Sequence, residues 1–241
     1  MKFISISILT SSIIAIISTL LYIKRRRLSR KLTIEESIAL KKGQQIMTDM
    51  FKEFDNICCT NGLKYWCVCG TLLGAVRHKG WIHHDADIDV AMLEPNYKKL
   101  QKNVQEKLSK DYWFQDKYYK SNIDKIRYLY AQYDDYKCQD WHNGIQLDIF
   151  VLKEEKDMLI CTANDDEVTT HNRNIIFLLK ELVFEKIKVY VPNQYKQYLI
   201  NQSGAYPPPK LPIHKQYPHE GRISFTIPTW VKKKYPQLYP I

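Results

Sequence analysis

Residues 85–89 place three aspartates at every second position: Asp85, Asp87 and Asp89 in the run DADID. Residues two apart on a strand point to the same face, so the three carboxylates are expected to project one way while the intervening apolar residues face a core. Like charges this close repel one another unless a cation neutralises them. Carboxylate oxygens are hard ligands that suit Mg²⁺ or Mn²⁺. The run therefore predicts a divalent-cation site with all three aspartates as ligands.

A further acid, Asp148, lies in the apolar run IQLDIFV. An aspartate on an internal strand needs a polar partner, because burying an isolated charge is costly. Taken alone, Asp148 is best explained as a residue at a strand end. Taken with the DADID run, it is predicted to be a further metal ligand brought in from an adjacent strand.

The segment before the aspartates, GTLLGAVRHKG at residues 70–80, has features of a phosphate site. Gly70 and Gly74 would let backbone N–H groups approach an anion at the positive end of a short helix. Arg77 and Lys79 add positive charge suited to phosphate oxygens. The order of strand, Gly-Thr turn, short helix, basic turn and acidic strand is typical of a nucleotidyltransferase-type site, in which metal ions hold a diphosphate for in-line displacement.

The elements that must position these residues can be predicted from periodicity. Thr33 and Glu36 form a capping-box pattern ahead of a helix that continues to Asn61-Gly62. Further strands are expected at 63–69, 87–93, 125–133, 144–153, 157–163 and 184–192, and further helices at 72–79, 96–110 and 194–201. The proline-rich residues 205–218 are not expected to form regular structure. This order predicts an α/β or α+β domain, with a mixed sheet flanked by helices, over residues 32–241.

Residues 1–31 are predicted to be a membrane anchor with a basic flank. Phe3–Ile23 contains no charge and as a helix would span about 31 Å, the thickness of a bilayer core. A cleavable signal peptide is the alternative, but no small-x-small cleavage site follows the run. Six positive charges at Lys24–Lys31 favour a single-pass protein with its domain on the cytoplasmic side. In a eukaryote the expected location is the ER or Golgi membrane, with the orientation open.

The net charge of +10 does not indicate a nucleic-acid partner. Seven of the 36 Lys and Arg residues lie in residues 1–31, and the rest of the chain holds 29 basic against 26 acidic residues. No basic-aromatic nucleic-acid motif is present either. The six cysteines form no CxxC pair and no zinc-finger spacing, so they are predicted to be small apolar core residues.

The run YWCVCGTLLGAVRHKGWIHHDADIDVAM closely resembles the signature of the LicD family, which also includes the fukutin-related proteins. The resemblance continues with GIQLDIF, where that family has a further aspartate. It extends more weakly to VFEKIKVYVPNQYKQYLINQSGAYP and covers roughly residues 60–210. This chain has His83-His84 where the family usually has Pro-Trp before the first aspartate.

The resemblance implies a nucleotidyltransferase-like fold. It also implies transfer of phosphocholine or a phospho-alditol, such as ribitol phosphate, from a CDP-linked donor to a glycan or glycolipid acceptor. By the same resemblance, Asp87, Asp89 and Asp148 would hold Mg²⁺ or Mn²⁺, and Asp85 would be a ligand or a base. Gly70, Thr71 and Arg77 would hold the donor's phosphates, and Arg77 would stabilise the phosphate in transfer.

Three other classes of protein remain open on the sequence. A DxD-type glycosyltransferase would also use an acidic pair and a metal, with a nucleotide-sugar donor. An HD-type phosphohydrolase is suggested by His83-His84-Asp85, but its His-Asp pair belongs on a helix. A non-catalytic membrane protein that retains the fold is disfavoured because all the acids are present.

Overall fold

The structure is a computed structural model that describes residues 32–116, 123–133, 143–164, 167–211, 216, 218 and 221–234. The predicted anchor at residues 1–31 lies outside these ranges. Among the described residues, no helix has both the length and the apolar character needed to span a bilayer.

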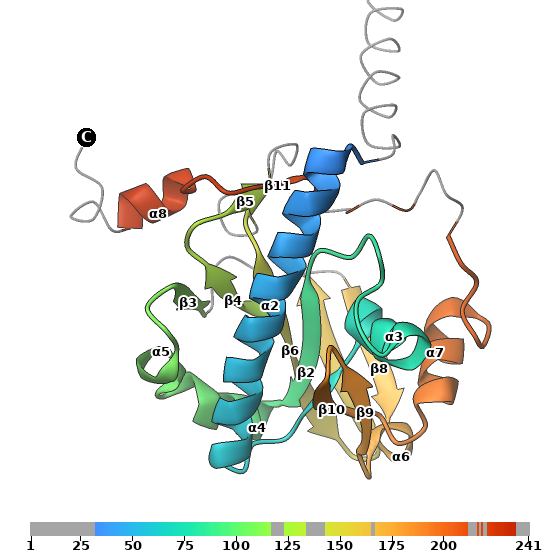
Figure 1. The fold of residues 1–241 in the computed structure, drawn as a ribbon. Helices are drawn as coiled ribbons and strands as arrows, with labels where there is room; N and C mark the ends of the chain where they lie inside the picture. Colours follow the sequence, from blue (N-terminus) through green and yellow to red (C-terminus); the bar gives the residue numbers. More distant parts are fainter. Residues whose placement is uncertain are drawn as a thin grey trace, which may run out of the picture.

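The long helix α2 (Ile34–Thr60) begins where the sequence predicts. The Thr33 side chain accepts from the Glu36 backbone N–H, and the Glu36 carboxylate accepts from the Thr33 backbone N–H. These bonds satisfy two donors that a helix start leaves without partners. The buried face of α2 carries Met47, Phe51 and Phe54, and the helix crosses the front of the central sheet (Figure 1).

The central sheet is mixed, as predicted, and has seven strands in the described part of the chain. β1 (Tyr65–Cys67), β2 (Ile88–Leu93), β6 (Gln146–Glu155), β4 (Ile123–Tyr128) and β3 (Tyr112–Gln115) follow one another across it. β7 (Met158–Asn164) pairs with the second half of β6, and β8 (Glu167–Asn172) pairs with β7. Among the strand pairs of this sheet that the structure describes, β2–β6 alone is parallel and the others are antiparallel.

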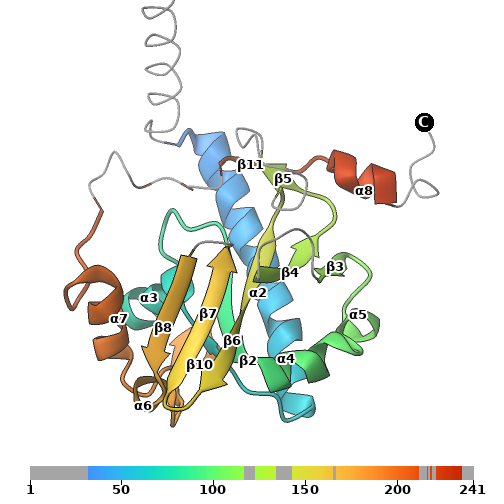
Figure 2. The same cartoon turned by 180° about the vertical axis from the view of Figure 1, so that it is seen from behind.

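The two faces of the sheet differ in chemistry. Ile88, Val90, Leu147 and Ile149 are all fully buried on the α2 side. The alternate positions point to the other face and include the aspartates of β2 and β6. Figure 2 shows the molecule from behind, so that this face is turned to the viewer and β6, β7 and β8 lie in front of α2.

The remaining elements surround the sheet. The helices are α3 (Cys69–His78), α4 (Glu94–Gln101), α5 (Val104–Lys107), α6 (Arg173–Ile176), α7 (Tyr195–Ser203) and α8 (Thr229–Lys234). β9 (Lys180–Phe184) and β10 (Ile187–Val191) form a hairpin, and β5 (Gln132–Tyr133) pairs with β11 (Ile223–Ser224).

Several predicted elements differ in the structure. The strand expected at 125–133 divides into β4 and β5, and the helix expected at 72–79 begins earlier, at Cys69. The single strand expected at 184–192 is half of a hairpin, because Glu185 and Lys186 both have positive φ and form a tight turn between β9 and β10. The helix expected at 96–110 divides into α4 and α5, and Gln105 ties α5 to β3 through bonds to Tyr112 O and Phe114 N. The strand expected to begin at Asp87 begins at Ile88.

Candidate metal centre

Three buried aspartates meet at one end of the β2–β6 pair. Asp87, Asp89 and Asp148 each offer a carboxylate oxygen, and these oxygens all lie within 4.8 Å of one another. Asp89 and Asp148 are register partners on the parallel strands β2 and β6, and Asp87 ends the segment that leads into β2. The exposed fractions are 6%, 7% and 4%. A buried set of three carboxylates fits a hard divalent cation, since its charges repel without one.

Asp85 lies outside this trio, although the sequence predicts it as a ligand. The strand begins only at Ile88 because the backbone before it is bonded to other groups. The Asp85 N–H donates to Ile82 O at 3.0 Å in a turn, and its carbonyl accepts from Gln44 Nε2 of α2 at 2.9 Å. The three aspartates therefore do not share one strand face: Asp85 and Asp87 belong to a loop, and Asp89 to the strand.

Two further bonds fix the acidic segment. The Tyr133 hydroxyl of β5 donates to Ala86 O at 2.8 Å, and the Asp89 N–H donates to Thr71 Oγ1 of α3 at 2.8 Å. Both bonds are buried, so each is costly to remove. Helices α2 and α3 and strand β5 thus hold Asp85–Asp89 from three sides. Gln44 and Tyr133 had no role in the sequence prediction, because neither lies near the acids along the chain.

Gly70 and Gly74 form the face of α3 on which this loop packs. A Cβ at Gly70 would collide with the Asp85 carboxylate, and a Cβ at Gly74 would collide with Gly80 O. The loop therefore runs back along α3 in close contact, which brings Asp85 to the start of the helix. A carboxylate there is favourable because the N-terminal end of a helix is electropositive. Gly70 was predicted to let the backbone approach a phosphate, and in the structure it packs against the Asp85 carboxylate.

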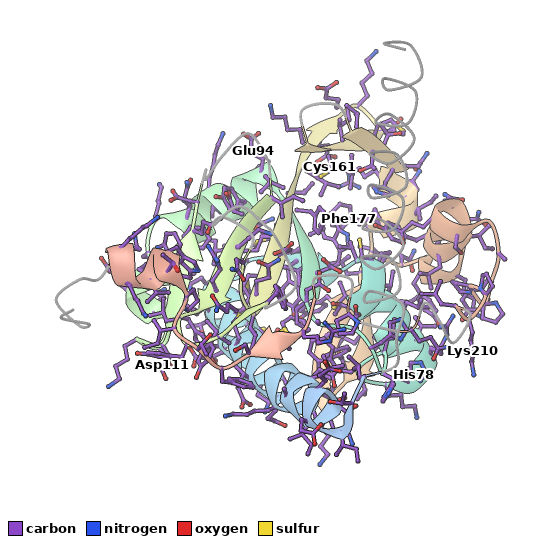
Figure 3. The ribbon with its side chains drawn as sticks, turned by 90° about the horizontal axis from the view of Figure 1, so that it is seen from above. His78, Glu94, Asp111, Cys161, Phe177 and Lys210 are labelled. Atoms are coloured by element: carbon purple, nitrogen blue, oxygen red, sulfur yellow. The ribbon has the colours of Figure 1, made fainter. Side chains whose placement is uncertain are left out.

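Arg77 and Lys79 lie at the other end of α3. The helix starts at Cys69, so Arg77 is about 12 Å from its N-terminus at 1.5 Å per residue. The Arg77 guanidinium donates to Pro208 O, and Lys79 is exposed with its carbonyl accepting from the Glu185 N–H. In Figure 3, His78 and Lys210 mark this side of the molecule. Neither Arg77 nor Lys79, the two basic residues predicted to bind phosphate, contacts the trio.

The cation beside the aspartates is Lys125 of β4. Its Nζ lies 2.7 Å from both oxygens of Asp148, and its side chain is fully buried. Lys125 is the register partner of Asp148 across β4 and β6. The sequence analysis predicted this strand but gave Lys125 no role in the site. The signal was present: Lys125 and Arg127 alternate with the core residue Ile126, which places two cations on the face that carries the acids.

The carboxylates also affect Cys69, the first residue of α3. Desolvation, followed by the negative charges of Asp89, Asp87, Asp148 and Asp85, raises the pKa of the Cys69 thiol well above its ordinary value. Cys69 is nevertheless accessible, because it lines a cavity. Of the other described cysteines, Cys58, Cys67 and Cys161 are buried, in line with the sequence prediction, whereas Cys59 is exposed.

This cavity, of about 550 Å³, lies on the same sheet face, one row of residues along from Asp89, Asp148 and Lys125. Ala91, Phe150 and Ile123 form the row next to Asp89, Asp148 and Lys125, and all three line the cavity. Its other walls come from β1, the start of α3, the outer strands and α7: Trp66, Val68, Cys69, Leu152, Cys161, Thr169, Thr170, His171, Tyr198, Asn201 and Gln202. His171 and Tyr198 stack with ring centroids 4.8 Å apart. The cavity therefore offers a mainly uncharged space beside the trio.

The family comparison covers the part of the chain that carries the trio. Residues 62–194 match the family model described as LicD/FKTN/FKRP, nucleotidyltransferase domain. This range contains the trio, Lys125 and both strands that carry the aspartates.

Individual relatives are distant and longer. The lipopolysaccharide cholinephosphotransferase LicD of Haemophilus influenzae is 31% identical over 98 residues, which are 41% of this chain and 34% of that protein. An uncharacterized protein of Rickettsia typhi is 28% identical over 171 residues, 70% of this chain and 46% of its own length. A second uncharacterized protein, from Rickettsia prowazekii, is 28% identical over 148 residues, 60% of this chain and 48% of its own. The chain spans less than half the length of each of these relatives.

Proposed function

Since the chain belongs to the LicD/FKTN/FKRP nucleotidyltransferase family, we propose that it is a metal-dependent transferase. It would move phosphocholine or a phospho-alditol from a CDP-linked donor to a hydroxyl of a glycan or glycolipid. The observation that carries this proposal is the buried trio Asp87, Asp89 and Asp148, inside the segment that matches the family. Cholinephosphotransferase is the printed activity of one relative, and it supports the donor class at low identity.

In this proposal the trio holds Mg²⁺ or Mn²⁺, which would neutralise charge on the donor's diphosphate. The acceptor oxygen forms a bond to the phosphorus of the transferred phosphocholine or phospho-alditol. The bond between that phosphorus and the bridging oxygen of the diphosphate breaks, and CMP leaves. The hydroxyl proton passes to a carboxylate, which we assign to Asp85 because Asp89 belongs to the trio. Gly70 and Thr71 keep the acidic segment in place through their contacts with Asp85 and Asp89.

The cavity beside the trio supports a substrate with an uncharged part. The trio can hold the phosphates through a metal ion, whereas the walls formed by Ala91, Phe150 and Ile123 suit carbon-rich groups. We propose that a part of the donor or the acceptor next to the reacting phosphate lies there.

We also propose that residues 1–31 anchor the domain in a membrane, close to a glycolipid acceptor. The support is the uncharged run Phe3–Ile23 with its basic flank. Just after it, Ile34 and Ile38 lie four residues apart on α2 and are 76% and 62% exposed. Flotation with vesicles tests this: the full chain is expected to float, and a chain lacking residues 1–31 is expected to stay in the soluble fraction.

The transferase proposal is tested by CMP release from a donor panel. The full chain in detergent would be incubated with Mn²⁺, a glycan or glycolipid acceptor, and CDP-choline, CDP-ribitol, CDP-glycerol, UDP-sugars or GDP-sugars. We expect metal-dependent CMP release from one CDP compound, abolished in Asp89→Asn and retained in Asp157→Asn, whose aspartate is exposed and outside the trio. Turnover of a UDP- or GDP-sugar would instead place the protein among the glycosyltransferases.

A further inference from the structure

We propose that Lys125 is a built-in counter-ion that shares Asp148 with the metal and thereby weakens the site's affinity for a divalent cation. It acts as a positioning residue, through Asp148. This inference uses the metal site of the proposed function, but it does not depend on which donor or acceptor is used.

Lys125 contacts Asp148, a carboxylate that a cation bound by the trio would also contact. Asp89, Asp148 and Lys125 stand in one row across β2, β6 and β4. The ammonium is 2.7 Å from both oxygens of Asp148, and Asp148 also belongs to the trio. A metal ion must therefore take a carboxylate that is already bonded to a lysine.

Burial makes this contact energetically important. Lys125 is fully buried and Asp148 is 4% exposed, so solvent screens their attraction less than it screens surface pairs. A buried ammonium is costly unless it is paired, and Asp148 supplies that pairing. The sheet register fixes the two backbone positions, and the Lys125 side chain is fully buried, so we expect its ammonium to stay beside Asp148 when a metal binds.

The charge count shows the consequence. The trio alone carries three formal negative charges, and Lys125 reduces the net charge of the four groups to −2. One divalent ion then neutralises these four groups. Without Lys125, the same ion would meet a more negative site, in which Asp148 offers all its lone pairs. A variant with an uncharged residue in place of Lys125 is therefore expected to bind a divalent ion more tightly than the unmodified protein, although Lys125 also helps to orient Asp148.

The test is Mn²⁺ binding by the full chain in detergent, measured from the free-ion electron paramagnetic resonance signal. Lys125→Met is expected to bind Mn²⁺ at least tenfold more tightly than the unmodified protein. Lys125→Gln, which keeps an N–H donor for Asp148 but no charge, is expected to do the same. Lys153→Met removes an exposed lysine of β6 and is expected to change the affinity less than twofold.

The outcomes separate the two proposals. Unchanged or weaker Mn²⁺ binding in folded Lys125→Met and Lys125→Gln would overturn the role of Lys125, and leave the metal site itself standing. Absence of Mn²⁺ binding in the unmodified protein would contradict the metal site and this inference together. If Lys125→Met folds only when Mn²⁺ is present, while Lys153→Met folds without it, the result supports the inference, because the metal then replaces the missing counter-ion.

Discussion

Asp89 and Asp148 are register partners on the only parallel strand pair of the described central sheet, and their carboxylates point to the same face. The two residues are far apart in the sequence, and the alignment of β2 with β6 brings them together. Asp87 and Lys125 complete the cluster from the preceding loop and from β4. The candidate metal centre is thus built mainly on strands, which hold side chains more rigidly than loops do.

The bond between Thr71 and Asp89 should be necessary for stability. In Thr71→Val the Asp89 N–H loses its buried acceptor, while the side-chain volume stays nearly constant. We expect the free energy of unfolding to fall by about 1–3 kcal/mol, measured by urea denaturation. Thr60→Val, at the exposed end of α2, is the control and should change little. Equal stability of the two variants would contradict the role given to this bond.

The contact between Gly70 and Asp85 predicts that substitutions at these two residues have non-additive effects on the free energy of unfolding. Gly70→Ala should destabilise the protein by about 1 kcal/mol, the low end of the cost of overpacking, because the added Cβ forces the end of the Asp85 side chain to move. Asp85→Ala removes the colliding group, so the double variant should lose clearly less stability than the sum of the single variants. Thermal unfolding of all four proteins measures this coupling. Strict additivity would show that the two residues do not meet.

Local sequence signals predicted the elements around the site well. The capping box at Thr33 and Glu36 is confirmed in the start of α2, and alternation correctly indicated strands at β2, β4, β6 and β7. These signals depend on neighbouring residues, so they can be read along the chain. β3 and β8 were missed because their short, mixed sequences carry little periodicity. The β9–β10 hairpin was missed because its turn is Glu185-Lys186, a pair that lacks glycine and asparagine.

The composition of the site was harder to predict than its elements. Asp87, Asp89 and Asp148 are brought together as expected, whereas Asp85 lies outside the trio, in a loop whose backbone is bonded to Ile82 and Gln44. The two glycines indicated close backbone approach, and the approaching group proved to be the chain's own loop. Lys125 was missed because its partner Asp148 is set by strand order, which the sequence alone does not define.

Arg77 should matter for the proline-rich segment rather than for metal binding. Its guanidinium holds Pro208 O at the far end of α3 from the trio. Arg77→Ala is expected to leave the Mn²⁺ affinity within twofold of the unmodified protein and to speed protease cleavage near residues 205–210. Limited proteolysis with mass spectrometry measures the second effect. A large loss of Mn²⁺ affinity together with unchanged proteolysis would argue against this placement.

Cys69 reports the charge of the site through its reactivity. The thiolate is the species that is alkylated, and desolvation, followed by the nearby carboxylates, raises the pKa of Cys69. Alkylation by iodoacetamide should therefore be slow at pH 8 and accelerate as the pH rises. Asp89→Asn removes a negative charge, lowers the pKa and should increase the rate at pH 8. Cys59 is the internal reference, because it is exposed and its pKa is raised by desolvation and then by Asp55 and Glu181, which lie outside the trio. An unchanged ratio of the two rates would count against the electrostatic account.

We expect Asp87, Asp89 and Asp148 to hold a divalent cation. Anomalous diffraction from crystals soaked in Mn²⁺ tests this expectation directly. An anomalous peak should be bonded to oxygens of all three aspartates, at about the 2.1 Å typical of small hard cations, and Asp148→Asn crystals should show no peak. Crystals of the unmodified protein with no peak at the trio, or with Mn²⁺ bound only elsewhere, would contradict it.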